Sequence, residues 1–223
     1  MTQPRAVTIV LPGVTLPGDL ALPARAGGLV LFAHGSGSSR LSPRNRFVAG
    51  VLNDARLATL LFDLLTPDED VDRAARFDIP LLAERLIEAA HWCRQQTELA
   101  ALPLGLFGAS TGAAAGLIAA ARLGPDVKAV VSRGGRPDLA PPEDIERVTA
   151  PTLLVVGEHD REVLRLNRRA AKSLRAPHAE RIVPGATHLF DEPGTLEQAA
   201  AAARDWFVRY LPESAATTSS SST

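Results

Sequence analysis

The chain has 223 residues, a length that suits one α/β domain with a sizeable buried core. Its net charge of −1 and its ordinary share of charged residues, 22%, argue against nucleic acid or an anionic membrane as a partner. The single cysteine, Cys93, excludes an internal disulfide. Residues 1–12 show no basic segment followed by a long apolar run, so we expect a cytoplasmic protein without a signal peptide or a transmembrane helix.

The first part of the chain predicts a hairpin followed by strand, loop and helix. Residues 6–11 and 14–22 alternate loosely in polarity and contain Pro-Gly pairs, which favours an antiparallel hairpin at a sheet edge. Residues 29–33 are continuously apolar, as in a strand buried on both faces. A polar, glycine-rich loop over 34–40 follows, and Ser42-Pro43 opens a predicted helix over 43–56.

The middle of the chain continues the alternation of strand and helix. Residues 59–64 predict a strand that runs into an acidic loop over 66–72. Asp78 is a predicted N-cap, and apolar residues at helical spacing follow it toward Thr97. Residues 104–107 predict the next strand.

A sharp turn follows that strand. The residues Gly108, Ser110 and Gly112 form the pattern Gly-x-Ser-x-Gly between an apolar strand and an Ala-rich helix that ends at Gly124-Pro125. In this setting the pattern is a nucleophile elbow, which lifts a serine hydroxyl above the sheet edge and needs glycine on either side for steric reasons. We therefore predict that Ser110 is a nucleophile; the alternative is a plain connecting loop.

The remaining elements complete an α/β domain over residues 1–211. Strands are predicted at 127–132, 151–157 and 181–183; helices follow Asp160 and a capping box formed by Thr195 and Gln198. The Ser/Thr-rich residues 212–223 are expected to be disordered. The order of elements predicts a mostly parallel central sheet with helices on both faces, and ligands in such folds bind beyond the carboxyl ends of the strands.

A serine hydroxyl needs a base within hydrogen-bond reach. Among the five histidines, His188 follows the last strand, where the base of such an elbow enzyme comes in the chain order Ser, acid, His. The predicted acid, which would orient the base, is Asp160 after the strongest late strand. Glu158 and Asp138 are the rival carboxylates, and an N-cap is the alternative role of Asp160.

The tetrahedral intermediate needs N–H donors for its negative oxygen. We expect one from the backbone of Thr111 and a second from the loop after residue 33, with the Ser36 N–H favoured and Gly37 second.

With these motifs in place, the sequence resembles the α/β-hydrolase superfamily and, within it, the dienelactone hydrolase-like group. The resemblance spans about Leu29 to Leu211 and rests on five segments: His34–Ser38, Asp63–Pro67, Phe107–Gly112, Gly157–Asp160 and Gly185–His188. It implies a single-domain hydrolase without a large lid that acts on esters or lactones with no metal or cofactor. Dienelactone hydrolases proper use a cysteine nucleophile where this chain has Ser110. Similar modules are also found fused to phosphoribosyltransferase domains, but no phosphoribosyl-binding segment is visible here.

The expected ligand is a small-molecule ester or lactone, and the oligomeric state is not set by the sequence. Candidate substrate-binding residues lie in loops at the carboxyl ends of strands: His34, Gly35, Gly37, Arg40 and Arg133. The arginines would bind a substrate carboxylate, and solvated loop charges are the alternative reading.

The leading hypothesis is a serine carboxylic-ester hydrolase. A thioesterase or amidase that uses the same residues, a non-catalytic binding module and a hydrolase based on Cys93 are the alternatives.

Overall fold

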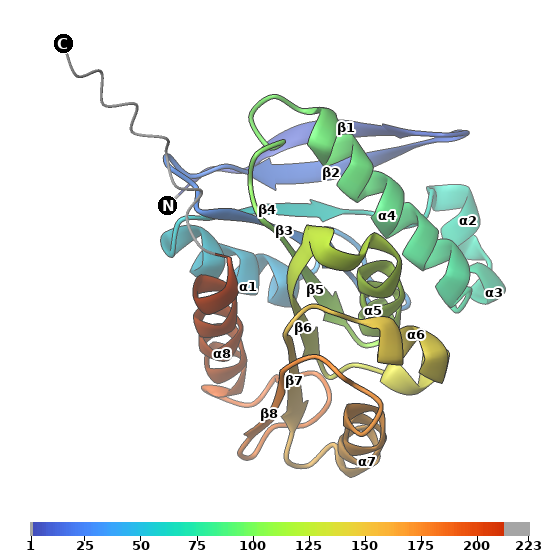
Figure 1. The fold of residues 1–223 in the computed structure, drawn as a ribbon, viewed down its shortest axis with the longest axis vertical. Coiled ribbons are helices and arrows are strands. Elements are labelled where there is room, and N and C mark those ends of the chain that lie inside the picture. The colour runs from blue at the N-terminus through green and yellow to red at the C-terminus, as the bar shows by residue number, and fades with distance from the viewer. Residues whose placement is uncertain (1, 212–223) are drawn as a thin grey trace.

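The computed structural model describes residues 2–211, which fold around one eight-stranded sheet (Figure 1). The strand order is β1-β2-β4-β3-β5-β6-β7-β8. Strands β3 to β8 are parallel, whereas β1 and β2 form an antiparallel hairpin at one edge. The strands are β1 (Arg5–Leu11), β2 (Val14–Ala21), β3 (Gly28–Ala33), β4 (Leu57–Phe62), β5 (Leu104–Ala109), β6 (Val127–Arg133), β7 (Thr152–Gly157) and β8 (His178–Val183). The predicted α/β fold with a mostly parallel sheet is confirmed.

Helices cover both faces of the sheet (Figure 1). One face packs against α1 (Pro43–Asp54) and α8 (Thr195–Tyr210). The other packs against α4 (Ile79–Gln95), α5 (Thr111–Leu123), α6 (Pro142–Arg147) and α7 (Arg161–Ala171). Strand β5 contributes apolar side chains to both faces of the sheet, so helices must cover both. Its side chains alternate, with Leu106 in the core on the α4–α7 face and Phe107 in the core on the α1–α8 face.

Two predicted connections were wrong in detail. The acidic loop contains the short helix α2 (Pro67–Val71), because Thr66 and Glu69 form a capping box, and α3 (Arg73–Arg76) follows it. At the last helix, the predicted capping box of Thr195 and Gln198 does not form. Gly194 is the N-cap residue, and the Thr195 hydroxyl donates to the carbonyl of Glu192 at 2.7 Å.

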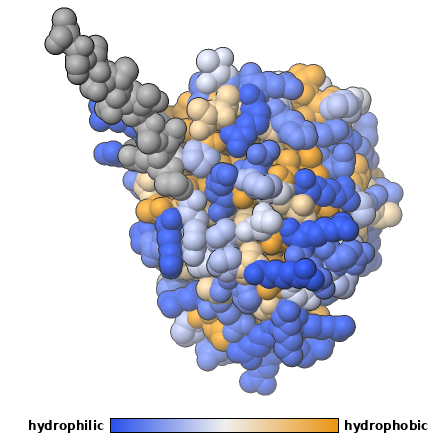
Figure 2. Space-filling model, viewed as in Figure 1, coloured by the Kyte–Doolittle hydropathy of each residue, from blue (hydrophilic) through white to orange (hydrophobic). Residues whose placement is uncertain are grey.

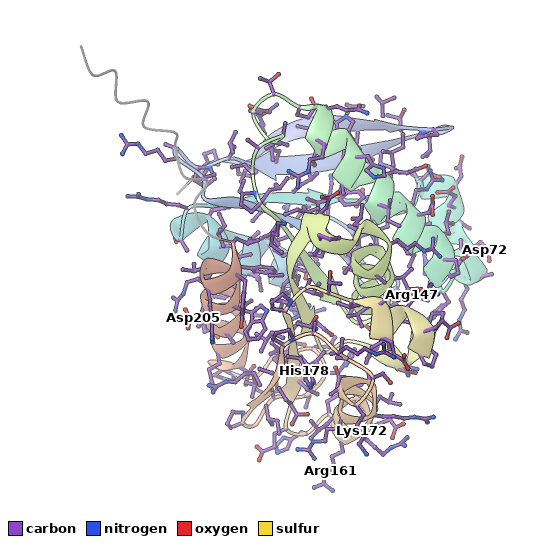
Figure 3. The ribbon with its side chains drawn as sticks, in the orientation of Figure 1. Asp72, Arg147, Arg161, Lys172, His178 and Asp205 are labelled. Atoms are coloured by element: carbon purple, nitrogen blue, oxygen red, sulfur yellow. The ribbon has the colours of Figure 1, made fainter. Side chains whose placement is uncertain are left out.

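Hydrophilic side chains cover the end of the molecule that α7 forms (Figure 2). Arg161, the first residue of α7, and Lys172, which follows its last residue, lie at this end (Figure 3). Within residues 2–211, no helix is both long and apolar enough to cross a membrane. The expected disorder of residues 212–223 lies outside the described residues.

Candidate active site

The turn between β5 and α5 holds Ser110 in a strained backbone conformation, with φ 51° and ψ −120°. Non-glycine residues rarely adopt positive φ, and such strain recurs at functional sites. The flanking glycines are sterically required. A Cβ on Gly108 would collide with the backbone of Ala113, and one on Gly112 would collide with the carbonyl oxygen of Ala33. The sequence therefore folds here into the elbow that its glycine spacing predicts.

The backbone of the elbow is anchored to the end of β6 and to the loop that follows it. The Ser110 N–H donates to the carbonyl of Arg133 at 3.3 Å, and the Arg136 N–H donates to the carbonyl of Ser110 at 3.0 Å. The first N–H groups of α5 have no acceptor within their own helix, as in any helix, and they carry the positive end of its dipole. Residue 110 therefore sits rigidly at a helix end that favours negative charge.

The second part of the site is a contact between His188 and Asp160. The Nδ1 atom of His188 lies 2.6 Å from Oδ2 of Asp160, whose side chain is largely buried. Asp160 is the N-cap residue of α7, yet its side chain makes no capping hydrogen bond, so its carboxylate is free for the imidazole. A carboxylate at Nδ1 places the other ring nitrogen, Nε2, away from Asp160 and fixes the tautomer in which Nε2 accepts a proton.

The rival carboxylates are engaged elsewhere. Glu158 accepts a hydrogen bond from the Gly185 N–H at 2.9 Å, and Asp138 forms an ion pair with Arg136 at 2.7 Å. Of the three acids that the sequence left open, Asp160 is the one that contacts His188.

The loops that carry the acid and the histidine touch along their backbones. A Cβ on Gly157 would collide with the carbonyl of Ala186, so glycine permits this close approach. The His159 N–H donates to the same carbonyl at 2.9 Å. On the far side of His188, Glu192 accepts from the hydroxyl of Thr187 at 2.6 Å and braces the loop. No motif in the sequence indicates this role of Glu192.

Ser110 and His188 line one cavity of about 220 Å³ at the carboxyl edge of the sheet. Its wall consists of Gly35, Ser36, Ser38, Ser42, Arg44, Asn45, Ala109, Ser110, Arg133, His188 and Leu189. Within residues 2–211 no hydrogen bond joins the Ser110 hydroxyl to the His188 ring. The structure thus brings the predicted nucleophile and base to one pocket, with the predicted acid behind the base.

The glycine-rich loop after β3 packs directly on the elbow. A Cβ on Gly35 would lie 3.0 Å from the Cβ of Ser110. The Ser36 N–H, expected to face the oxyanion, donates to Oγ1 of Thr111 at 2.8 Å. His34 faces away from the cavity: its Nε2 accepts from the Leu64 N–H at 3.1 Å, and its Nδ1 donates to its neighbour's carbonyl at 3.0 Å. Gly37 borders a smaller hollow beside His34.

Comparison with known proteins decides the family. A solved structure of dienelactone hydrolase from Anabaena variabilis superposes with a TM-score of 0.91 and 51% identity, covering 94% of this chain and 98% of that one. The chain belongs to the dienelactone hydrolase family. An esterase domain of a Rhodothermus marinus protein shares the fold at a TM-score of 0.76 and 20% identity, covering 94% of this chain and 99% of that one. No family model matches the sequence.

This dienelactone hydrolase family member also matches part of a longer protein. A Mycobacterium tuberculosis protein with the name "Putative phosphoribosyl transferase" is 56% identical over 205 residues. The match covers 92% of this chain but 46% of the relative, so the chain spans about half the length of that protein.

The two arginines that were predicted to bind substrate, Arg40 and Arg133, have different surroundings. Arg40, expected beside the substrate, instead forms an ion pair with Asp63 at 2.5 Å, and its backbone N–H donates to the same carboxylate at 2.7 Å. Arg133 does line the cavity, at 8% exposure. Its Nη2 donates to Oδ1 of Asn45 at 3.3 Å, an interaction between residues 88 positions apart that the sequence analysis missed.

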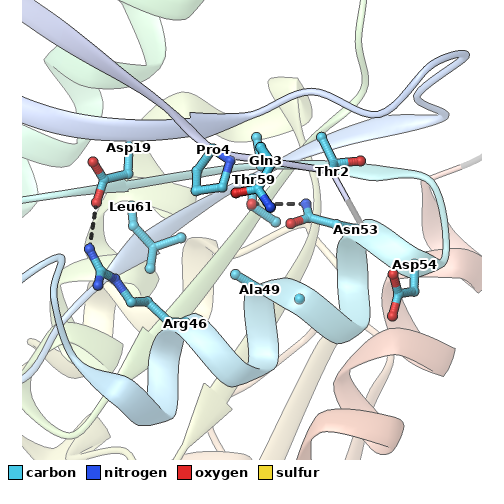
Figure 4. Close-up of a pocket in the computed structure, with 12 residues that line it drawn as sticks. Thr2, Gln3, Pro4, Asp19, Arg46, Ala49, Asn53, Asp54, Thr59 and Leu61 are labelled. Carbon is cyan, nitrogen blue, oxygen red and sulfur yellow. Dashed lines mark hydrogen bonds and ion pairs between the residues drawn. The ribbon is translucent and has the colours of Figure 1, made fainter.

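A second hollow, of about 350 Å³, lies between α1 and the strands β2 and β4 (Figure 4). Its wall is held by an ion pair between Arg46 and Asp19 at 3.1 Å and by a hydrogen bond from Asn53 to Thr59 at 3.0 Å. It is larger than the Ser110 cavity, but it contains none of the three triad candidates. Among the described residues, no group of three or more His, Cys, Asp or Glu side chains could hold a metal ion.

Proposed function

We propose that this protein is a serine hydrolase that cleaves carboxylic esters or lactones, with Ser110 as nucleophile, His188 as general base and Asp160 as the residue that orients the base. The observation that carries this proposal is the 2.6 Å contact between Asp160 and His188, because His188 lines the same cavity as the strained Ser110. Membership of the dienelactone hydrolase family, shown by similarity to the Anabaena enzyme, supports the same reaction class.

The first half of the reaction acylates the serine. Nε2 of His188 takes the hydroxyl proton as Oγ of Ser110 bonds to the substrate carbonyl carbon, and the carbonyl oxygen becomes negative. The tetrahedral intermediate then collapses, its bond to the alcohol oxygen breaks, and His188 returns the proton to that oxygen. Asp160 stabilises the imidazolium while it exists.

The second half releases the acid. Water gives a proton to His188 and adds to the acyl carbonyl carbon; the bond to Oγ of Ser110 then breaks, and Oγ regains the proton from His188. The alcohol and the carboxylic acid are the two products of an ester, and a lactone gives one hydroxy acid. No step requires a redox partner.

The negative oxygen of each intermediate requires donors. We propose the backbone N–H of Thr111 as the first, because it lies at the open end of α5 directly after the nucleophile. The Ser36 N–H is the proposed second donor. It now donates to the Thr111 hydroxyl, so this role requires that the oxyanion replace that hydroxyl as its acceptor.

The cavity favours small substrates. A volume of about 220 Å³ is below the range of roughly 300–1,000 Å³ that drug-sized ligands occupy. We expect kcat/KM to fall as the acyl chain of a p-nitrophenyl ester lengthens.

The test is the Ser110→Ala variant. We expect kcat on short p-nitrophenyl esters to fall by roughly four to six orders of magnitude, with labelling by a fluorophosphonate probe abolished and the thermal unfolding midpoint retained. Ester turnover that survives in a folded Ser110→Ala protein would refute the proposal. A matched series of ester, thioester and amide substrates distinguishes an esterase from a thioesterase or an amidase.

A further inference from the structure

We propose that Asn167 of α7 is a positioning residue for the triad. Its amide joins the helix that begins after Asp160 to the loop behind Ser110, and it thereby holds the acid where His188 needs it. The inference rests on the proposed hydrolase function and adds a residue that acts through Asp160. Asn167 is not among the residues that line the Ser110 cavity.

Asn167 is a buried amide in the middle of an apolar stripe. The buried residues of α7 are Val163, Asn167 and Ala170, which recur at helical spacing. The Asn167 side chain is fully buried, and its Oδ1 atom has no hydrogen-bond partner within residues 2–211. A buried amide with one unpaired atom costs free energy relative to an apolar side chain of the same size, so stability alone does not explain its presence.

The amide nitrogen of Asn167 makes two hydrogen bonds. Nδ2 donates to the carbonyl of Val163 at 2.8 Å, within α7, and to the carbonyl of Gly135 at 2.9 Å, in the loop after β6. Because both acceptors are carbonyl oxygens, the nitrogen side of the amide must face them. The bond to Gly135 is therefore a direct polar link between α7 and this loop.

The loop after β6 contacts both the nucleophile and the base. The Arg136 N–H donates to the carbonyl of Ser110 at 3.0 Å. Gly134 packs against His188, since a Cβ on Gly134 would lie 3.6 Å from Cε1 of the imidazole. The Gly134 N–H also donates to the carbonyl of Val155 in β7 at 2.7 Å. The sheet and the elbow thus hold the loop in place, and α7 is attached to it through Asn167.

The apolar face of α7 is small. Val163 and Ala170 are its buried apolar residues, and the opposite face is exposed and carries charges such as Arg161 and Arg165. A helix with so little apolar area gains little free energy from burial. The hydrogen bond from Asn167 therefore accounts for a large share of what fixes α7 against the loop.

Asp160 lies at the start of this helix. It is the N-cap residue of α7, about two turns before Asn167 and on the same side of the helix. Without the bond from Asn167 to Gly135, the start of α7 would be able to move, together with the carboxylate that lies 2.6 Å from Nδ1 of His188. A misplacement of about 1 Å at a catalytic group can lower a rate by about 100-fold.

The experiment replaces the amide with an apolar side chain of similar size. Asn167→Leu should lower kcat on a short p-nitrophenyl ester by roughly 10- to 100-fold and change KM by less than about threefold, because the acid moves while the cavity wall remains. Asn53→Leu is the matched control. Nδ2 of Asn53 also donates two hydrogen bonds, to Leu57 and Thr59, but it ties α1 to β4 outside the cavity, so kcat should be retained.

A double-mutant cycle distinguishes positioning from a general structural defect. In the Asp160→Asn background, Asn167→Leu should lower kcat by less than about threefold further, because the acid that Asn167 positions is already lost. The Ser110→Ala protein serves as the blank. If Asn167→Leu does not fold, Asn167→Ser replaces it, since a serine hydroxyl can still donate to Val163 one turn back but is too short to reach Gly135.

A wild-type kcat in Asn167→Leu, an equal loss in Asn53→Leu, or equal losses with and without Asp160 would overturn the inference while leaving a Ser110-dependent esterase in place. If no ester is hydrolysed, the proposed function fails instead. Crystal structures of wild type and Asn167→Leu then decide the role of Asn167. The variant should separate Asp160 from His188 beyond the hydrogen-bond distance of about 3.2 Å, and a pair still within that distance would overturn the inference.

Discussion

Nδ1 of His188 and Oδ2 of Asp160 lie 2.6 Å apart, across two loops that follow neighbouring strands of the sheet. The first prediction tests this pair. Asp160→Asn should lower kcat by roughly 10³- to 10⁴-fold, because an amide no longer holds the imidazole in the tautomer that accepts the serine proton.

The matched control is Glu158→Gln, two residues away. Glu158 accepts a backbone N–H from Gly185, and a glutamine oxygen accepts the same bond, so kcat should be retained. Steady-state kinetics on one p-nitrophenyl ester compares both variants. If Glu158→Gln lowers kcat more than Asp160→Asn does, the assignment of Asp160 as the acid is wrong.

The second prediction concerns two glycines of helix α5. Gly112→Ala should reduce the free energy of unfolding by more than about 3 kcal/mol, because its Cβ would collide with the Ala33 carbonyl, which belongs to the sheet and cannot move. Gly116→Ala meets open space and should raise stability by up to about 1 kcal/mol, since alanine is the better helix former. Urea titration measures both values, and similar stabilities in the two variants would contradict the packing argument.

The third prediction concerns Cys93, the one thiol of the chain. Burial in α4 raises the pKa of Cys93 to about 12, so at pH 8 the thiolate that reacts with alkylating reagents is about one part in 10⁴. Iodoacetamide should leave the native enzyme active and should label Cys93 only in denaturant. Parallel loss of activity and of free thiol under native conditions would revive a cysteine-based mechanism.

The fourth prediction is a pH dependence of stability that comes from His34. Burial holds the pKa of this histidine below its ordinary value of 6.5. As pH falls below about 6.5, His34 is protonated in the unfolded chain before it is protonated in the folded protein. The free energy of unfolding therefore declines by up to about 1.4 kcal/mol per pH unit. The decline levels off below the pKa of the folded protein.

His34→Gln removes this titration while keeping one donor and one acceptor for Gly35 and Leu64. Unfolding midpoints measured from pH 7.5 to 5 should fall more steeply in wild type than in the variant. Parallel curves would show that His34 does not titrate differently in the two states.

The fold was predictable from the sequence where local patterns are strong. The continuous apolar runs of β3 and β7 favour buried strands, and the glycine spacing around Ser110 favours the elbow. Capping signals were less decisive. Thr66 and Glu69 carry a capping box that could have been recognised, whereas Thr195 and Gln198 carry the same spacing without forming one, because Gly194, at φ 77°, is the N-cap residue.

The site was predictable as far as the order of its residues along the sequence indicates their roles. That order places a histidine and an acid after late strands, but it does not separate Asp160 from Glu158. Their directions depend on the turn after Gly157, which is set by contact with the loop at Ala186. The pairing of Arg133 with Asn45 joins β6 to α1 across 88 positions, and no local pattern in the sequence encodes such a distant contact.

The two ends of the described chain lie at the edge of the sheet opposite Ser110. Leu211 packs against Gly28, the first residue of β3, and Gly105, the second residue of β5, so it lies at the amino-terminal edge of the parallel strands. Arg5 pairs with Leu20 toward the same edge. Ser110 occupies the opposite edge. A further module joined at either end would therefore be attached at the edge of the sheet opposite the Ser110 cavity. The mycobacterial relative, of which the match covers 46%, is long enough to carry such a module.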